Sequence, residues 1–334
     1  MLAAWNRHGV TLRPLFASLL VAATISNLPA QSTAIRIWGH GSRNGNSVGN
    51  LVGLWNRDFT RTHPGTHFDV SLSGDSAAMG GLYTGAADMA LMGREIWPIE
   101  QEGFEQASGH KPLEISVMTG SLDVPRHSFA LVIYVHKNNP LSKLTLAQVD
   151  AVFVADHRWG LANIRTWGDL GLSGEWAAQS LNLYGFAIQQ DFSQFFQQAI
   201  MGGSKKWNCN LHEFRDRGSV DAGQQILDAL ARDRYGIAIS SLAYRNPNTK
   251  VMALAAPADD YVMPTRETVV ARQYPLARPV SIVVNRDPAA PLDSRIKDYL
   301  TYVLSRDGQQ RVVQDGGYLP LPEVIAEQEK MKLQ

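Results

Sequence analysis

Short apolar segments alternate with amphipathic segments along most of the chain. The apolar segments read as strands, and between them apolar residues recur at helical spacing, as Leu51, Trp55 and Phe59 do. Parallel neighbouring strands need long crossover connections, so this alternation predicts a mainly parallel sheet with helices on both faces. The pattern occurs twice, which predicts two α/β units. The expected strands cover residues 35–39, 68–72, 89–92, 129–135, 181–185, 237–240 and 280–285.

The composition narrows the functional class. Of the 334 residues 45% are hydrophobic, and 31 Lys and Arg balance 31 Asp and Glu, which describes a folded globular protein. Zero net charge argues against a nucleic-acid or anionic-membrane partner, because such partners are bound through an excess of basic residues. The single cysteine, Cys209, excludes an intramolecular disulfide and a zinc cluster of cysteines. His63 and His67 are separated by Pro64-Gly65, which breaks the helix that would align them on a metal, and neither a metal nor another cofactor is expected.

The first thirty residues differ from the rest of the chain. Arg7 and Arg13 lie in a basic segment, residues 15–25 are apolar, and Ala30 is a small residue suited to cleavage. The apolar run is shorter than the ~20 residues that span a bilayer. Residues 1–30 are therefore expected to be a signal peptide cleaved near Ala30, which would send the mature protein to the periplasm of a Gram-negative host. The alternative is an ordinary N-terminal helix.

Four stretches resemble one known family. They are Ser73-Gly74-Asp75-Ser76 with Gly85-Ala86-Ala87-Asp88-Met89-Ala90; residues 135–141 with 144–149; Thr166-Trp167-Gly168-Asp169-Leu170; and residues 304–310 with 317–321. In order and spacing these stretches resemble the phosphate-type periplasmic solute-binding proteins, the receptors of ABC transporters.

This resemblance implies a two-lobed, type II periplasmic-binding-protein fold. The first lobe would hold residues 31–125 and 245–334, and the second lobe residues 126–244. The two lobes would close over phosphate or another small anion without catalysing a reaction. The resemblance also implies a monomer that delivers its ligand to an ABC transporter permease.

The resemblance and the physics of helix N-termini, whose free N–H groups favour an anion, suggest a set of ligand contacts. For several of them a structural role is equally open. Ser and Asp near residue 75 are ordinary helix N-caps, Arg94 could pair with Glu95 or another acid, and Ser219 could be a cap. In the first loop the contact could instead come from residues 45–47. The candidates are Gly41, Ser42, Arg43, Ser73, Gly74, Asp75, Ser76, Arg94, Gln189, Gln190 and Ser219.

The chain departs from the family in the second lobe. After a strand like 181–185 the family typically carries an Arg and then Ser-Gly-Thr, whereas residues 186–193 here read Phe-Ala-Ile-Gln-Gln-Asp-Phe-Ser. Gln189 and Gln190 can donate amide hydrogens, but Asp191 would repel an anion. Each lost charge-assisted hydrogen bond weakens binding by roughly 1.5–3 kcal/mol. Binding of another solute, or of a partner protein for sensing, therefore stays open. A phosphate-ester hydrolase is a further alternative, although no nucleophile or metal site for it is evident.

Overall fold

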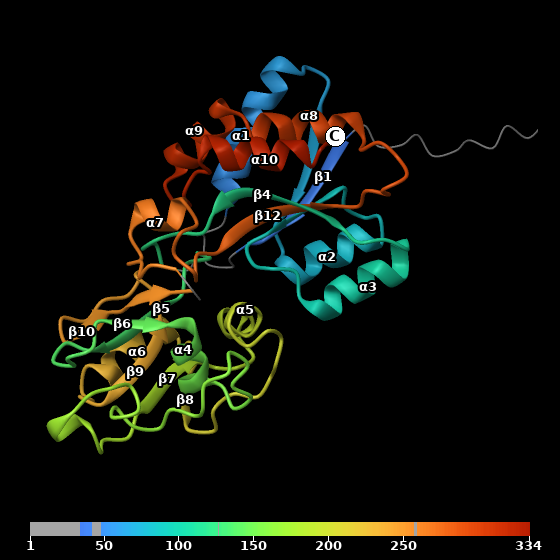
Figure 1. Cartoon of the computed structure of the whole chain (residues 1–334). Helices are drawn as coiled ribbons and strands as arrows, with labels where there is room; N and C mark the ends of the chain where they lie inside the picture. The colour runs from blue at the N-terminus through green and yellow to red at the C-terminus, as the bar shows by residue number, and fades with distance from the viewer. Residues whose placement is uncertain (1–33, 42–47, 126, 257–258) are drawn as a thin grey trace, which may run out of the picture. The chain divides into compact units, whose positions relative to one another are not determined.

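The computed structural model describes residues 34–41, 48–125, 127–256 and 259–334 (Figure 1). Two five-stranded sheets and a two-stranded ribbon organise these residues. We call the elements around the first sheet the first lobe and those around the second sheet the second lobe. This is the two-sheet α/β architecture that the alternating pattern predicted.

The first sheet has the strand order β2-β1-β3-β12-β4. Its central strand β1 pairs in parallel with β2 and β3, because helical crossovers separate these strands in the chain, whereas β12 pairs antiparallel with both β3 and β4. The strands are β1 (Ala34–Gly39), β2 (His67–Ser71), β3 (Met89–Met92), β4 (Leu113–Thr119) and β12 (Pro279–Val284).

Helices cover both faces of the first sheet (Figure 1). On one face α1 buries Trp55 and Phe59 against Tyr299 and neighbouring side chains. On the other face α2 and α3 enclose a smaller cluster around Phe104. The helices are α1 (Gly49–Thr62), α8 (Ser294–Val303), α9 (Arg306–Asp315) and α10 (Glu323–Met331) on the first face, and α2 (Asp75–Tyr83) and α3 (Pro98–Ser108) on the second.

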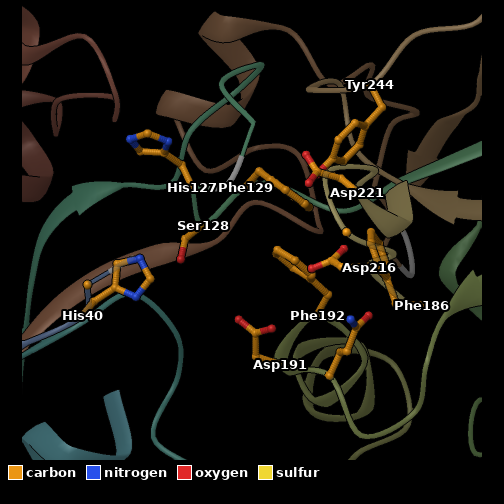
Figure 2. A pocket seen from close by; sticks show the side chains of 13 residues that line it. His40, His127, Ser128, Phe129, Phe186, Asp191, Phe192, Asp216, Asp221 and Tyr244 are labelled. Carbon is orange, nitrogen blue, oxygen red and sulfur yellow. The ribbon is translucent and has the colours of Figure 1, made fainter. Parts of the chain in front are cut away.

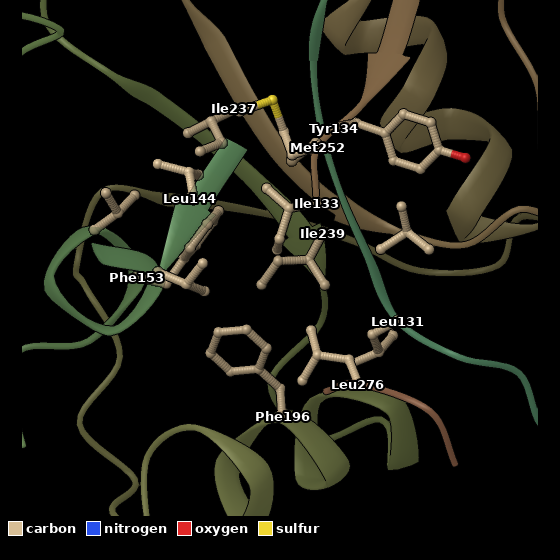
Figure 3. Close-up of a cluster of buried hydrophobic side chains, with 14 of the residues drawn as sticks. Leu131, Ile133, Tyr134, Leu144, Phe153, Phe196, Ile237, Ile239, Met252 and Leu276 are labelled. Atoms are coloured by element: carbon tan, nitrogen blue, oxygen red, sulfur yellow. The ribbon is translucent and has the colours of Figure 1, made fainter. Parts of the chain in front are cut away.

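The second sheet has the order β10-β5-β9-β7-β8, and β6 and β11 form the separate ribbon. Buried side chains such as Ile133, Phe153, Phe196 and Ile239 form the core of the second lobe (Figure 3). The strands are β5 (Val132–His136), β6 (Lys143–Thr145), β7 (Asn182–Phe186), β8 (Leu211–Phe214), β9 (Gly236–Ser240), β10 (Thr249–Val251) and β11 (Ala253–Ala255). The helices are α4 (Leu146–Phe153), the 3-10 turn η1 (Gly174–Trp176), α5 (Asp191–Ala199), α6 (Ala222–Leu230) and α7 (Arg266–Val270).

Three details differ from the sequence predictions. Each five-stranded sheet has two parallel and two antiparallel pairings, whereas mainly parallel sheets were expected. The strand expected at 129–135 joins its sheet only at Val132, and the buried residues before it belong to a segment that crosses from the first lobe. The return to the first lobe was expected at residue 245, but β10 and β11 still pair with β5 and β6. Tyr274 and Leu276 also pack into the second core, so the chain rejoins the first sheet only at β12. Short strands with little periodicity, such as β10 and β11, give no sequence signal of which sheet they join.

The two crossing segments run side by side. The Leu131 amide donates to the Leu276 carbonyl at 3.1 Å, and the Gly120 amide donates to the Arg278 carbonyl at 2.7 Å. These bonds connect the stretch before β5 with the stretch before β12.

The expected signal peptide, residues 1–30, lies outside the described residues. Within the described ranges, no helix combines the length and the apolar character needed to cross a membrane.

Candidate functional site

A cavity of about 390 Å³ collects side chains from both lobes and from a crossing segment (Figure 2). Its walls are the turn after β1, the crossing segment near Ser128, the start of α5 and the loop that leads into α6. The lining residues are His40, Gly41, His127, Ser128, Phe129, Phe186, Gln190, Asp191, Phe192, Asp216, Gly218, Asp221 and Tyr244.

Gly41 is the predicted first-loop residue that the structure places in this cavity. A Cβ at this position would lie 2.1 Å from the Leu72 carbonyl oxygen, so the backbone approaches too closely for any side chain. The predicted contacts Ser42 and Arg43, and the alternative contact at residues 45–47, lie outside the described residues.

Asp75 acts on the cavity through His40. Its carboxylate lies 3.2 Å from His40 Nδ1 and accepts a hydrogen bond from the Gly93 amide at 2.7 Å. Burial raises the pKa of Asp75, but the hydrogen bond and charge of His40, the charge of Arg94 and the Gly93 amide outweigh burial and leave the pKa below its usual value. His40 lines the cavity and Asp75 does not, so Asp75 orients the imidazole.

His40 and Gln190, two residues that line the cavity, each carry an unsatisfied buried polar atom. Among the described residues, neither His40 Nε2 nor Gln190 Oε1 has a hydrogen-bond partner, although both atoms are buried. Gln190 precedes α5 without capping it through its side chain. Buried polar atoms are normally paired, so these two are candidates for contact with a ligand or water.

Arg94 is committed to a structural pair. Its guanidinium donates to both Glu100 oxygens, at 2.8 and 2.6 Å, and also to Ser76 Oγ at 3.0 Å. Its Cζ lies 3.9 Å from the centre of the Trp97 ring, and the residue is 4% exposed. Arg94 and Ser76 therefore face each other and Glu100, and neither lines the cavity. An ion pair was the alternative foreseen for Arg94, but with Glu95 named as the first partner.

The other predicted contacts also lie off the cavity. Ser73 Oγ lies 3.2 Å from Ser71 Oγ, and Gly74 adopts φ 117° immediately before α2, a conformation that favours glycine. Gln189 accepts a hydrogen bond from Arg215 at 2.7 Å. Ser219 is an exposed residue of the tight turn that joins Arg217 to Val220.

The second-lobe wall is aromatic and acidic, and of its rings and carboxylates only Asp191 was singled out from the sequence, as a group that would repel an anion (Figure 2). The rings of Phe129 and Phe192 stack with centroids 4.2 Å apart, and Tyr244 meets Phe129 edge-on at 6.0 Å. Asp191, Asp216 and Asp221 add carboxylates to the same wall. The apolar spacing of Phe192 within its helix read as core packing, and nothing in the local pattern marked the carboxylates as neighbours.

Arg278 is a buried charged residue that is absent from the predicted ligand contacts. It immediately precedes β12, and its guanidinium is 0% exposed. Nε and Nη2 donate to Glu95 at distances of 3.0 to 3.1 Å, whereas Nη1 lies 3.8 Å from Asp191 Oδ2. Burial lowers the pKa of Arg278, but the charges of Glu95 and Asp191 outweigh burial and raise it overall. Apart from an arginine directly before an apolar strand, nothing in the sequence marks Arg278 as the partner of Glu95 and Asp191.

Comparison with known proteins identifies the family. The model of the PBP superfamily domain matches residues 29–307. This chain belongs to the PBP superfamily. The "Phosphate-binding protein PstS" of Pseudomonas aeruginosa is 33% identical over 315 residues, which are 93% of this chain and 92% of that protein. "Protein SphX" of Synechococcus elongatus is 24% identical over 274 residues, covering 79% and 72% of the two chains.

Solved structures agree with the superfamily fold. The crystal structure of PstS from Borrelia burgdorferi gives a TM-score of 0.57 at 15% identity, with 86% of this chain and 99% of that chain covered. An ABC-type phosphate transport receptor from Vibrio cholerae gives 0.55 at 18% identity, with 86% and 100% covered. The type II fold expected from the resemblance is confirmed. The superfamily match and the 33% identical relative, rather than these structures, identify the chain as a solute-binding protein and not an enzyme, as the resemblance implied.

Within the described ranges, no group of three or more His, Cys, Asp or Glu side chains is arranged to hold a metal ion.

Proposed function

We propose that this protein captures phosphate or a related oxyanion between its lobes and delivers it to an ABC transporter. The observation that carries this proposal is the 33% identity to the Pseudomonas aeruginosa phosphate-binding protein, which extends over 93% of this chain. An alignment of that length covers both lobes and both crossing segments.

The cavity supports an anion through local groups. The start of α5 lies at the cavity, and the N-terminus of a helix carries free N–H groups and a partial positive charge. His40 adds an imidazole whose Nε2 donates when the ring is protonated, and Ser128 adds a hydroxyl. Because the chain has no net charge, recognition has to come from such groups and not from a general positive field.

A second candidate ligand follows from the aromatic and acidic wall. Carboxylates beside stacked rings are suited to an ammonium group, and the cavity of about 390 Å³ falls in the size range of small-molecule sites. An organic phosphate that carries an ammonium group would place its two ends against the two kinds of wall.

Calorimetry on ligand-stripped protein tests both candidates. Phosphate, sulfate, molybdate and 2-aminoethyl phosphate are titrated separately at one pH and salt concentration. Tight binding of phosphate supports the oxyanion proposal, and stronger binding of the aminoethyl ester favours the second candidate. Absence of heat and of thermal stabilisation with every compound would refute both.

Export, transporter coupling and a monomeric state complete the proposal. Residues 1–30 would be removed near Ala30, which N-terminal sequencing of the protein from a periplasmic fraction tests. A permease gene beside this one, and loss of phosphate uptake when the binding protein is deleted, would support the transporter partner. Light scattering with and without phosphate would reveal any dimer.

A further inference from the structure

Arg278 is a buried cation with one unsatisfied end. Its side chain is 0% exposed, and three hydrogen bonds from Nε and Nη2 bind it to Glu95. Among the described residues, Nη1 has no hydrogen-bond partner. A buried guanidinium that leaves donors unpaired loses the water that would otherwise solvate them, so the free end needs an explanation.

Asp191 is the group that faces this free end. Its Oδ2 lies 3.8 Å from Arg278 Nη1, which is within ion-pair range but beyond a hydrogen bond. Asp191 is the first residue of α5, it lines the cavity, and its side chain is 42% exposed, whereas Arg278 itself is not among the lining residues of the ligand-free cavity. The carboxylate therefore has room to move toward solvent, whereas the guanidinium is immobilised.

Packing and hydrogen bonding hold Arg278 in place without Asp191. Its Cζ lies 5.5 and 5.2 Å from the ring centres of Phe192 and Phe195, and its backbone carbonyl accepts the Gly120 amide at 2.7 Å. Glu95 engages the Nε side of the guanidinium, which leaves the Nη1 end directed at the start of α5. Such an arrangement preorganises a donor for an oxygen anion.

We propose that Arg278 is an anion-binding residue of the site and that Asp191 holds the place of the ligand's oxyanion in the ligand-free protein. This inference rests on the proposed oxyanion function. On binding, one ligand oxygen takes the position at Nη1, next to the N-terminal amides of α5, and the Asp191 carboxylate swings away toward solvent. Arg278 thereby supplies the positive charge that residues 186–193 lack.

The proposal predicts opposite effects for the two members of the pair. Asp191→Asn removes the competing charge, so phosphate should bind about tenfold more tightly. Arg278→Lys keeps the charge but loses the planar fork, so phosphate should bind at least about tenfold more weakly. The double variant Glu95→Gln with Arg278→Gln removes both buried charges and so leaves neither unpaired. In this background, adding Asp191→Asn should raise phosphate affinity by less than about threefold.

The experiment is a set of phosphate titrations by calorimetry on the whole protein, with circular dichroism to verify folding of each variant. Asp156→Asn is the matched control, because Asp156 lies outside the cavity, pairs with Lys206 at 3.2 Å, and Asn retains an acceptor for the Ser204 hydroxyl that Asp156 now accepts at 2.6 Å. The control should raise phosphate affinity by less than about threefold, because the effect of a charge far from Arg278 is screened by solvent and salt.

The outcomes separate this inference from the proposed function. If wild type binds phosphate and Asp191→Asn binds equally or more weakly, the inference is overturned and the function stands. Equal gains in Asp191→Asn and Asp156→Asn would also overturn it, because the effect would then be one of general charge. If the Arg278 variants do not fold, the contrast between Asp191→Asn and Asp156→Asn still decides. Failure of every variant to bind any oxyanion would refute the function and the inference together.

Discussion

Arg94 donates a hydrogen bond to each carboxylate oxygen of Glu100, at 2.8 and 2.6 Å, and so connects the end of β3 to the start of α3. The same carboxylate accepts the Trp97 amide at 3.0 Å and thereby caps α3. Arg94, which was expected to contact a ligand, thus stabilises the first lobe through Glu100.

Glu100→Gln should destabilise the protein without changing its affinity for phosphate. It removes the negative charge opposite a buried guanidinium, and we expect a loss of about 3 kcal/mol in the free energy of unfolding, measured with urea. Glu175→Gln breaks an exposed pair with Arg234 and should lose no more than about 1 kcal/mol. A drop in phosphate affinity of Glu100→Gln by more than about tenfold would instead place Arg94 in the binding site.

Asp75 should make stability depend on pH in the acid range. Its pKa in the folded protein is lowered, so folding favours the ionised form. That stabilisation is complete above the unfolded pKa of about 3.9 and is lost as the pH falls from there through the folded pKa. The difference in urea midpoint between wild type and Asp75→Asn should therefore shrink as the pH falls below about pH 4. A difference that stays constant at low pH would contradict this linkage.

Gly93 leaves the space that the His40 ring occupies. A Cβ on Gly93 would lie 2.5 Å from His40 Cγ, so Gly93→Ala should push the imidazole out of its position beside Asp75. If His40 binds the ligand, phosphate affinity should fall about tenfold or more in calorimetry. Gly103→Ala in α3 meets nothing within 4 Å and should bind phosphate as wild type does, with up to about 1 kcal/mol of added stability. Unchanged affinity in Gly93→Ala would remove His40 from the site.

The fold was predictable because apolar residues recur along the chain at the spacings of strands and helices. Strand β3 has the bounds expected from its apolar run, and α1 contains Leu51, Trp55 and Phe59, whose spacing predicted a helix. The same reasoning was less successful at β10 and β11, since three-residue strands contain too few residues to show which sheet they join.

The site was less predictable because it is assembled from distant positions. Gly41 and Gln190 lie in the loops after β1 and β7, where the resemblance and the physics of helix N-termini suggested ligand contacts, and both line the cavity. Arg94 follows a strand as well, but its partner Glu100 lies on the next helix, and sequence does not rank one acid over another as its partner. Arg278 reaches Glu95 across a separation of 183 residues, because the antiparallel pairing of β12 with β3, which sets Ser281 opposite Met92, brings the two positions together.

Gln309 shows how one of the family-like stretches contributes to the fold. Its buried amide donates to the carbonyls of Val117 and Val303, both at 2.9 Å, and accepts the Leu321 amide at 2.7 Å. It thus holds β4, the end of α8 and the segment before α10 together.

Gln309→Met keeps the length of this side chain and leaves three buried backbone groups without their partner. We expect a loss of at least about 3 kcal/mol in urea unfolding, because each buried unsatisfied group costs about 1–3 kcal/mol. Gln310→Met changes the next residue, which is exposed, and should stay within about 0.5 kcal/mol of wild type. Since Gln309 lies away from the cavity, phosphate affinity should be retained wherever the variant is folded. Equal stability of the two variants would mean that water satisfies the three groups and that this stretch does not hold the lobe together.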